Sequence, residues 1–386
     1  MIYFDNNATT PVDPLVLEGM LPYLQNQFGN PSSAYKLGRQ AKQAVAQARG
    51  QIAALVGAEP EEIVFTSCGT ESDNTAINAA LNSDPDRKHL ITSRVEHSAI
   101  NNQAQFLARR GYEITWLEVD ALGQPDLDQL RDAIRPDTAI VSLMWANNET
   151  GVLFPIQDIA EICRERRTVF HTDAVQAAGK LPIDLGSGAV QFLSLSGHKL
   201  HAPKGIGALY VNRRTRFSPY LFGGGQEQGK RSGTENVPYI AAFGRAAELA
   251  LNHLRNYPDS VRAVRDRFEQ AILERISGVS VNGDREHRLS NTTNLRIEGV
   301  DSEAMLIVLD QQGLCCSAGS ACTTGSLVPS HVLKAMGLAD DQARSSLRFS
   351  FSRMNTLAEV DQALDIIDRA VTRVRSANEN LSVSTV

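Results

Sequence analysis

The chain has 386 residues, of which 42% are hydrophobic and 21% charged, a composition typical of a folded globular protein and unlike that of a disordered or collagen-like chain. Because 38 Lys and Arg stand against 44 Asp and Glu, the net charge is -6, which gives no basic field for holding nucleic acid. The N-terminus has no basic and apolar leader, and no uncharged run is long enough to cross a bilayer. We therefore expect a cytoplasmic protein that binds neither nucleic acid nor membrane.

The first elements expected along the chain are helices over 13–24 and 33–56. From about residue 60, short β-branched and aromatic runs alternate with segments of helical period, such as 98–111 and 156–167. The runs predict seven strands: 61–67, 88–93, 112–119, 138–145, 167–173, 191–196 and 205–211. This alternation predicts an α/β fold with a mostly parallel sheet covered by helices on both faces. Since the last two runs are too close together for a helical crossover, they predict an antiparallel pair at or near a sheet edge.

The C-terminal part of the chain has a different organisation. A polar, glycine-rich segment over 221–238 is predicted to be a long functional loop. A helical stretch follows from about 238 to 277, interrupted near Pro258, and we place a domain boundary within it, near residue 255. Beyond it the patterns predict strands, helices and a loose tail: strands over 291–297 and 345–352, helices over 302–312, 330–337 and 356–376, and the tail over 381–386.

Lys199 is the first candidate for chemistry, because it stands on a short turn directly after a strongly apolar strand. Partial desolvation there would lower the pKa of the amine and make it a nucleophile for carbonyl groups, although a solvated surface lysine is the commoner case. Asp173 ends another strand, at the sheet edge where open α/β sheets bind ligands. This pair is what a pyridoxal phosphate site requires, lysine for the Schiff base and a carboxylate for the pyridine nitrogen. Gln176 would then hydrogen-bond the phenolic oxygen of the cofactor.

A phosphate group needs backbone N–H donors at the start of a helix. The segment 68–72 supplies them where it joins a strand to a helix over 73–81, since Gly69 permits close approach and Thr70 can cap the helix and contact an oxygen. Plain helix capping is the simpler interpretation of this short motif. His97 ends a strand at the same sheet edge, where its imidazole could stack on the cofactor ring and exchange protons near neutral pH.

The cysteines are odd in number, and free thiols are expected in a chain large enough to build its own core. There are five: Cys68, Cys163, Cys315, Cys316 and Cys322. Cys322 lies among small residues over 317–325, which would leave its sulfur accessible to a substrate. A buried, inert thiol is the alternative. A metal site shared with Cys315 and Cys316 is disfavoured, because their spacing matches no usual zinc or iron–sulfur pattern.

Ten motifs occur in order through nearly the whole chain: FDNNATTP, FGNPSS, TSCGTESDN, VEH, WANNETG, HTDAVQAAGK, SGHKLHAPKGIGALY, RSGTEN, SAGSACT and SSLRFS. Together they closely resemble a cysteine desulfurase of the NifS/IscS type, in the class V group of fold-type I pyridoxal-phosphate enzymes. Any one motif would be weak, whereas their ordered occurrence is highly specific. The sequences of the segments WANNETG and LSLSGHKLHAPKG resemble the NifS branch more than the IscS branch.

The resemblance implies a homodimer whose large domain, residues 13–255, binds the cofactor and whose smaller α+β domain, residues 1–12 and 256–386, carries the catalytic cysteine. It implies cofactor contacts from Lys199 as the Schiff base, His97 on the ring, Asp173 at the pyridine nitrogen, Gln176 at the phenolic oxygen, and Gly69, Thr70, Ser196 and His198 at the phosphate, with Thr234 reaching in from the other subunit. It implies that the substrate carboxylate is bound by Asn148 and Arg348, with Asn30 nearby.

The activity that the resemblance implies is conversion of L-cysteine to L-alanine. Lys199 would remove the Cα proton, and the Cys322 thiolate would take the sulfur as a persulfide. That sulfur would supply iron–sulfur cluster assembly, with the nitrogenase cofactor as one option, through an iron–sulfur scaffold or another acceptor protein. No metal is expected in catalysis, beyond a transient contact between Cys322 and a cluster.

Other functions remain open. A selenocysteine lyase, or another class V pyridoxal-phosphate enzyme, would keep Lys199 and Asp173 without requiring Cys322. A non-catalytic sulfur carrier or metal-binding module would have no use for the cofactor residues. Cys315 and Cys316 stand where small or aliphatic residues are expected in relatives, so a second thiol that accepts the persulfide is an alternative to inert packing. The longer C-terminal tail by which the IscS branch engages its scaffold is missing, which leaves the acceptor open.

Overall fold

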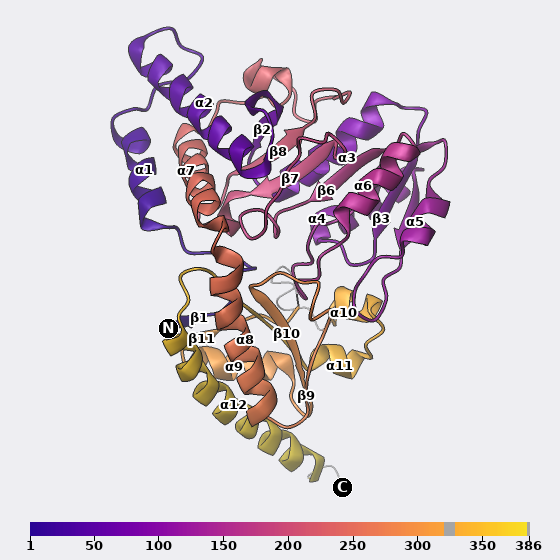
Figure 1. Ribbon diagram of the computed structural model, residues 1–386, viewed down its shortest axis with the longest axis vertical. Helices are drawn as coiled ribbons and strands as arrows, with labels where there is room; N and C mark the ends of the chain where they lie inside the picture. The colour runs from indigo at the N-terminus through magenta and orange to yellow at the C-terminus, as the bar shows by residue number, and fades with distance from the viewer. Residues whose placement is uncertain (320–328, 384–386) are drawn as a thin grey trace.

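The computed structural model describes residues 1–319 and 329–383. Figure 1 shows an upper part built around a large sheet and a lower part built around a small one, with α7 (Val237–Leu254) above α8 (Tyr257–Arg275) at their junction. The predicted interruption is present, because the helix breaks at residues 255–256 and Pro258 lies in the first turn of α8, where a missing N–H is tolerated. Within the described ranges, no helix is both long and apolar enough to span a membrane.

The large sheet has seven strands, in the order β2-β8-β7-β6-β5-β3-β4. Their bounds are β2 Ile63–Thr66, β3 His89–Ser93, β4 Glu113–Leu117, β5 Thr138–Ser142, β6 Val169–Asp173, β7 Phe192–Ser196 and β8 Gly207–Val211. β8 runs antiparallel to both of its neighbours, and the other neighbouring strands run parallel. The predicted mostly parallel sheet is therefore confirmed, as is the antiparallel pair, which lies next to the edge strand β2.

Helices cover both faces of this sheet, as predicted. They are α1 Pro14–Gln25, α2 Lys36–Val56, α3 Gly69–Ser83, α4 Ser98–Ala108, α5 Leu127–Ala133 and α6 Ile156–Glu165, together with α7. Alternate strand residues point to opposite faces. In β2, Ile63 and Phe65 pack in the apolar cluster that includes α1, α2, α6 and α7, whereas Val64 packs with α3 and α4.

The lower part contains a three-stranded antiparallel sheet and a separate parallel pair of strands. Its strands are β9 Val279–Val281, β10 Thr292–Ile297 and β12 Ser346–Ser350 in the sheet, and β1 Ile2–Tyr3 with β11 Leu314–Cys315 in the pair. Its other helices are α9 Ser302–Gln311, α10 His331–Ala335, α11 Asp340–Arg344 and α12 Leu357–Val383. The loose tail predicted from residue 381 is wrong for residues 381–383, which continue α12 because no glycine or proline ends the helix earlier.

The lower part has an apolar cluster of its own, which joins Ile2 and Phe4 to side chains between Tyr257 and Val374. A few late residues, Val332 and Ala343 among them, pack instead against the large sheet and its helices. The division into a large domain and a small domain near residue 255 stays a proposal, supported by the separate cluster.

Candidate active site

The carboxyl ends of β3, β6 and β7 meet at one edge of the large sheet, beside a cavity of about 210 Å³. Most of the predicted site residues line this cavity: Gly69, Thr70, His97, Asn148, Asp173, Gln176, Ser196, His198, Lys199 and Arg348. They come from segments far apart in the sequence, so the fold brings them together as one site.

Three predicted site residues are not among the lining residues. Cys322 lies outside the residues that the structure describes. Asn30 is exposed and closes a local turn, where its Oδ1 accepts a hydrogen bond from the N–H of Ser32. Thr234 is exposed and does not line the cavity of its own chain. The role of Thr234 in the other subunit and the role of Asn30 near the substrate remain predictions.

Lys199 lies on a short 3-10 turn, Gly197–Lys199, directly after β7. The turn needs a glycine at 197, because an added Cβ would lie 2.8 Å from Cγ2 of Ile206. Lys199 Nζ donates hydrogen bonds to the main-chain oxygens of Asn7 and Ala8, the latter at 2.8 Å. Our sequence reasoning assigned no role to these two residues, although the motif FDNNATTP contains them. The N-terminal segment thus holds the lysine amine at the cavity.

His97 is the N-cap residue of α4, and its Nδ1 accepts a hydrogen bond from the N–H of Ala99 at 3.2 Å. Burial lowers the pKa of His97 to about 4, helped by the charges of Lys199 and His331. The ring is therefore neutral at pH 7, and because Nδ1 is an acceptor its proton sits on Nε2. This arrangement suits a group that handles a proton inside the cavity.

Asp173 ends β6, and its Oδ1 accepts a hydrogen bond from the N–H of Val175 at 2.8 Å. Burial raises the pKa of Asp173 to about 6, against that hydrogen bond and the charge of Lys199. Two further buried acids near it were missed by the sequence reasoning. Burial and the charge of Asp173 raise the pKa of Asp73, which also lines the cavity. Burial, with a smaller contribution from Asp173, raises the pKa of Glu96 to about 8.

Asp73 and Glu96 each have one carboxyl oxygen without a hydrogen bond to any residue that the structure describes. Within the described residues, Oδ1 of Asp73 and Oε2 of Glu96 are buried without a hydrogen bond. A buried carboxyl group with an unsatisfied oxygen favours a positively charged neighbour. The side of the cavity at Asp173 therefore suits a cationic ring such as a protonated pyridine.

An environment that suits an anion lies at the start of α3. Gly69 is the first residue of this helix, and a Cβ there would lie 2.9 Å from Cγ2 of Val175 and 3.4 Å from Cβ of Ser196. Only glycine fits this position, and the unpaired amides of the first turn suit an anion. The helix begins earlier than the predicted 73–81, so Cys68 rather than Thr70 occupies the N-cap position. The capping expectation for Thr70 is wrong, because the strand-to-helix turn is tighter than the pattern indicated.

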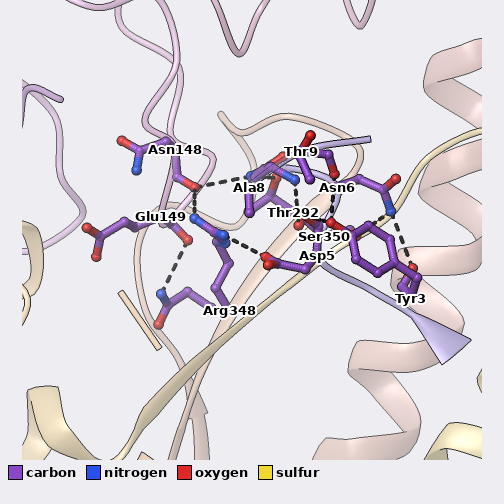
Figure 2. Close-up of polar contacts among 12 residues, drawn as sticks. Tyr3, Asp5, Asn6, Ala8, Thr9, Asn148, Glu149, Thr292, Arg348 and Ser350 are labelled. Atoms are coloured by element: carbon purple, nitrogen blue, oxygen red, sulfur yellow. Dashed lines mark hydrogen bonds and ion pairs between the residues drawn. The ribbon is translucent and has the colours of Figure 1, made fainter. Parts of the chain in front are cut away.

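Arg348 is 1% exposed and lies in β12, between the two parts of the molecule. Figure 2 shows its guanidinium between Asn148, whose main-chain oxygen accepts from Nη1 at 3.0 Å, and Asp5, which pairs with Nη2 at 2.7 Å. Nε of Arg348 is buried and has no hydrogen-bond partner within the described residues. An anchored guanidinium with unused donors is suited to binding a carboxylate.

Three of the described thiols, those of Cys163, Cys315 and Cys316, do not have the character of nucleophiles. Burial raises the pKa of Cys163 to about 12, and burial also raises the pKa values of Cys316 and Cys315. These thiols stay protonated near neutral pH, which favours inert packing over a second persulfide carrier. Across residues 1–319 and 329–383, no group of three or more His, Cys, Asp and Glu side chains is arranged to hold a metal ion.

Comparison with known proteins gives a consistent result. The description "Aminotransferase class-V" belongs to the family model that matches residues 2–363. This chain belongs to the class-V aminotransferase family. Within that family it is similar to cysteine desulfurase 2 of Trichormus variabilis, with 53% identity over 97% of this chain and 94% of that protein. It is 47% identical to the cysteine desulfurase NifS of Azotobacter vinelandii, over 98% of this chain and 94% of that one.

Solved structures agree with this family assignment. A NifS-like protein superposes with a TM-score of 0.90 at 34% identity, covering 96% of this chain and 99% of that one. The structure described as SspA in complex with cysteine has a TM-score of 0.81 at 38% identity, covering 92% of this chain and all of that one. The predicted NifS/IscS-type resemblance and the predicted fold class are therefore confirmed, and the chain is an enzyme of the cysteine desulfurase type.

Proposed function

We propose that this enzyme takes sulfur from L-cysteine, releases L-alanine and carries the sulfur on Cys322 as a persulfide. The observation that carries the proposal is that Lys199, Asp173 and Arg348 line one cavity. A lysine amine, a buried carboxyl group and an anchored guanidinium together suit an amino-acid substrate and a pyridine cofactor.

The cavity residues fit pyridoxal phosphate. Lys199 would hold the aldehyde carbon and Asp173 the ring nitrogen, where the buried acids favour a positive charge. The phosphate would be held by the first amides of α3 with three side chains: Thr70, Ser196 and His198. When bound, this cofactor supplies an electron sink for the charge left on the substrate Cα.

Arg348 and Asn148 would bind the substrate carboxylate. Asp5 and the main-chain oxygen of Asn148 hold the guanidinium in place through one N–H each, which leaves further N–H groups for the carboxylate. The complex of the related SspA with cysteine supports L-cysteine as the amino acid bound in such a cavity. Binding through the carboxylate would orient the substrate Cα toward Lys199.

The protein groups then divide the proton and sulfur transfers. Lys199 Nζ acts as the base that removes the Cα proton, and neutral His97 offers the proton on its Nε2. The Cys322 thiolate attacks the substrate sulfur, so that an S–S bond forms while the substrate C–S bond breaks. The electron pair of that C–S bond stays with the substrate Cβ, which takes a proton. Cα regains the proton that Lys199 removed, and the product leaves as L-alanine.

The test measures alanine and sulfide formed from L-cysteine with a reducing thiol, after loading the protein with pyridoxal phosphate. We expect equal amounts of both products from the wild type. Cys322→Ser should keep the absorption of the bound cofactor and lose turnover, whereas the matched control Cys315→Ser should retain both. Undiminished turnover in Cys322→Ser would refute the persulfide role. Turnover of L-selenocysteine alone would favour the selenocysteine lyase alternative.

A homodimer is part of this proposal. On α1, at the outer edge of the upper part in Figure 1, the side chains of Leu17, Leu21 and Leu24 are exposed at helical spacing. An exposed apolar stripe of this kind supports packing against a second copy, which would supply Thr234. The sulfur acceptor, an iron–sulfur scaffold or another protein, and the cytoplasmic location remain predictions.

A further inference from the structure

Lys180 is a buried lysine beside the active-site cavity, and the proposed mechanism gives it no role. It is 6% exposed and lies in the turn after β6, four residues beyond Gln176. Lys180 does not line the cavity itself, whereas Gln176 does. A buried amine is costly unless its N–H groups are satisfied, so its partners indicate its purpose.

The first partner of Lys180 is the amide of Gln176. Lys180 Nζ donates to Oε1 of Gln176 at 2.8 Å, while Nε2 of Gln176 donates to the main-chain oxygen of Asn7 at 3.0 Å. A carbonyl oxygen can only accept, so the end of the amide that faces Asn7 must be the NH2 group. Because Asn7 lines the cavity and Lys180 does not, the NH2 end of Gln176 lies on the cavity side.

The second partner of Lys180 is the side chain of Asn7, whose Oδ1 accepts from Nζ at 3.3 Å. Burial, together with the charges of Lys199 and Arg348, holds the pKa of Lys180 well below its usual value. Whether or not it is protonated, the amine has at least two N–H groups, which match the two oxygens that it contacts. Lys180 therefore joins Gln176 to Asn7, whose main-chain oxygen also accepts from Lys199.

We propose that Lys180 is a positioning residue of the cofactor site, which holds the Gln176 amide with its NH2 group presented to the phenolic oxygen of pyridoxal phosphate. The inference rests on the proposed function and deepens it. A donor to that oxygen stabilises its negative charge and so weakens its hold on the proton of the Schiff-base nitrogen. Without Lys180 the side-chain amide of Gln176 can flip, and its oxygen would then face the phenolic oxygen of the cofactor.

The test follows the absorption of the bound cofactor against pH in three variants: Lys180→Met, Gln176→Leu and the double variant. One net hydrogen bond corresponds to a shift of about half to one pH unit, so each single variant should raise the midpoint by about that amount. The midpoint of the double variant should be no higher than that of Gln176→Leu alone, because both changes remove the same donor. Lys42→Met, on the exposed face of α2, is the matched control and should leave the midpoint unchanged.

An unchanged midpoint in Lys180→Met overturns the inference, and so do additive shifts, because Lys180 would then not act through Gln176. If Lys180→Met does not fold, Gln176→Glu provides the second test. Its carboxylate would pair with Lys180 but offer no N–H, so we expect a melting temperature near that of the wild type together with a raised midpoint. Failure of Gln176→Glu to fold would contradict the contact. A wild type that takes up no pyridoxal phosphate would overturn the proposed function as well.

Discussion

Replacing Arg348 with lysine tests the substrate site most directly. Arginine has five N–H donors. In this structure Nη1 and Nη2 of Arg348 each use one, on Asn148 and Asp5, and the Nε hydrogen has no partner in the described part of the chain. The remaining donors form a planar fork that matches a carboxylate, whereas Arg348→Lys keeps the positive charge and loses the fork.

The expected size of the effect follows from the bonds lost. A hydrogen bond to a charged group contributes about 1.5–3 kcal/mol, and about 1.4 kcal/mol is a factor of ten in binding. Loss of one such bond should therefore raise the KM for L-cysteine by about 10- to 150-fold. The kcat should change far less, because the carboxylate is remote from the bond that breaks.

The assay compares L-cysteine with cysteamine, which has the same amine and thiol but no carboxylate. Arg348→Lys should raise the KM for L-cysteine and leave the inhibition constant of cysteamine nearly unchanged. Arg267→Lys, whose guanidinium pairs with Asp361 on the surface, is the control and should alter neither constant. An equal weakening of both ligands would refute the reasoning, since the effect would then not pass through the carboxylate.

Two further substitutions test the core of the site in the cofactor-free protein. Gly69→Ala should lower the free energy of urea unfolding by about 1–3 kcal/mol and weaken pyridoxal phosphate binding, because its Cβ meets Val175 at 2.9 Å. The control Gly50→Ala has open space around it and should raise the free energy of unfolding by about 1 kcal/mol. Equal effects of the two substitutions would contradict the steric argument. Glu96 keeps in the folded state a proton that it releases when unfolded, so its contribution to the free energy of unfolding should fall as pH rises from about 4.5 to about 8. This pH dependence amounts to at most about 1.4 kcal/mol per pH unit, and Glu96→Gln should remove it when the free energies of urea unfolding at pH 5 and 8 are compared. An unchanged pH dependence would count against the raised pKa of Glu96.

Much of the fold could be predicted because its signals are local. Strand runs such as those ending at Asp173 and Ser196 are short and rich in apolar residues, which indicates burial on both faces, and their alternation with helices implies parallel order. The start of α3 was placed too late, since the tight turn at Gly69 depends on contact with Val175, which lies about a hundred residues away in the sequence. Helix ends set by such contacts carry little local signal.

The sequence by itself determined which chemistry is present: an amine at Lys199 and a carboxyl group at Asp173 stand at strand ends, and those ends share one edge in any parallel sheet. Only the tertiary structure decided how these groups are held. The contacts of Lys199 with Asn7 and of Arg348 with Asp5 join residues that are 192 and 343 positions apart in the sequence. Burial and ion pairing depend on what packs around a group in three dimensions, so neither the partners nor the pKa shifts can be deduced from a local pattern.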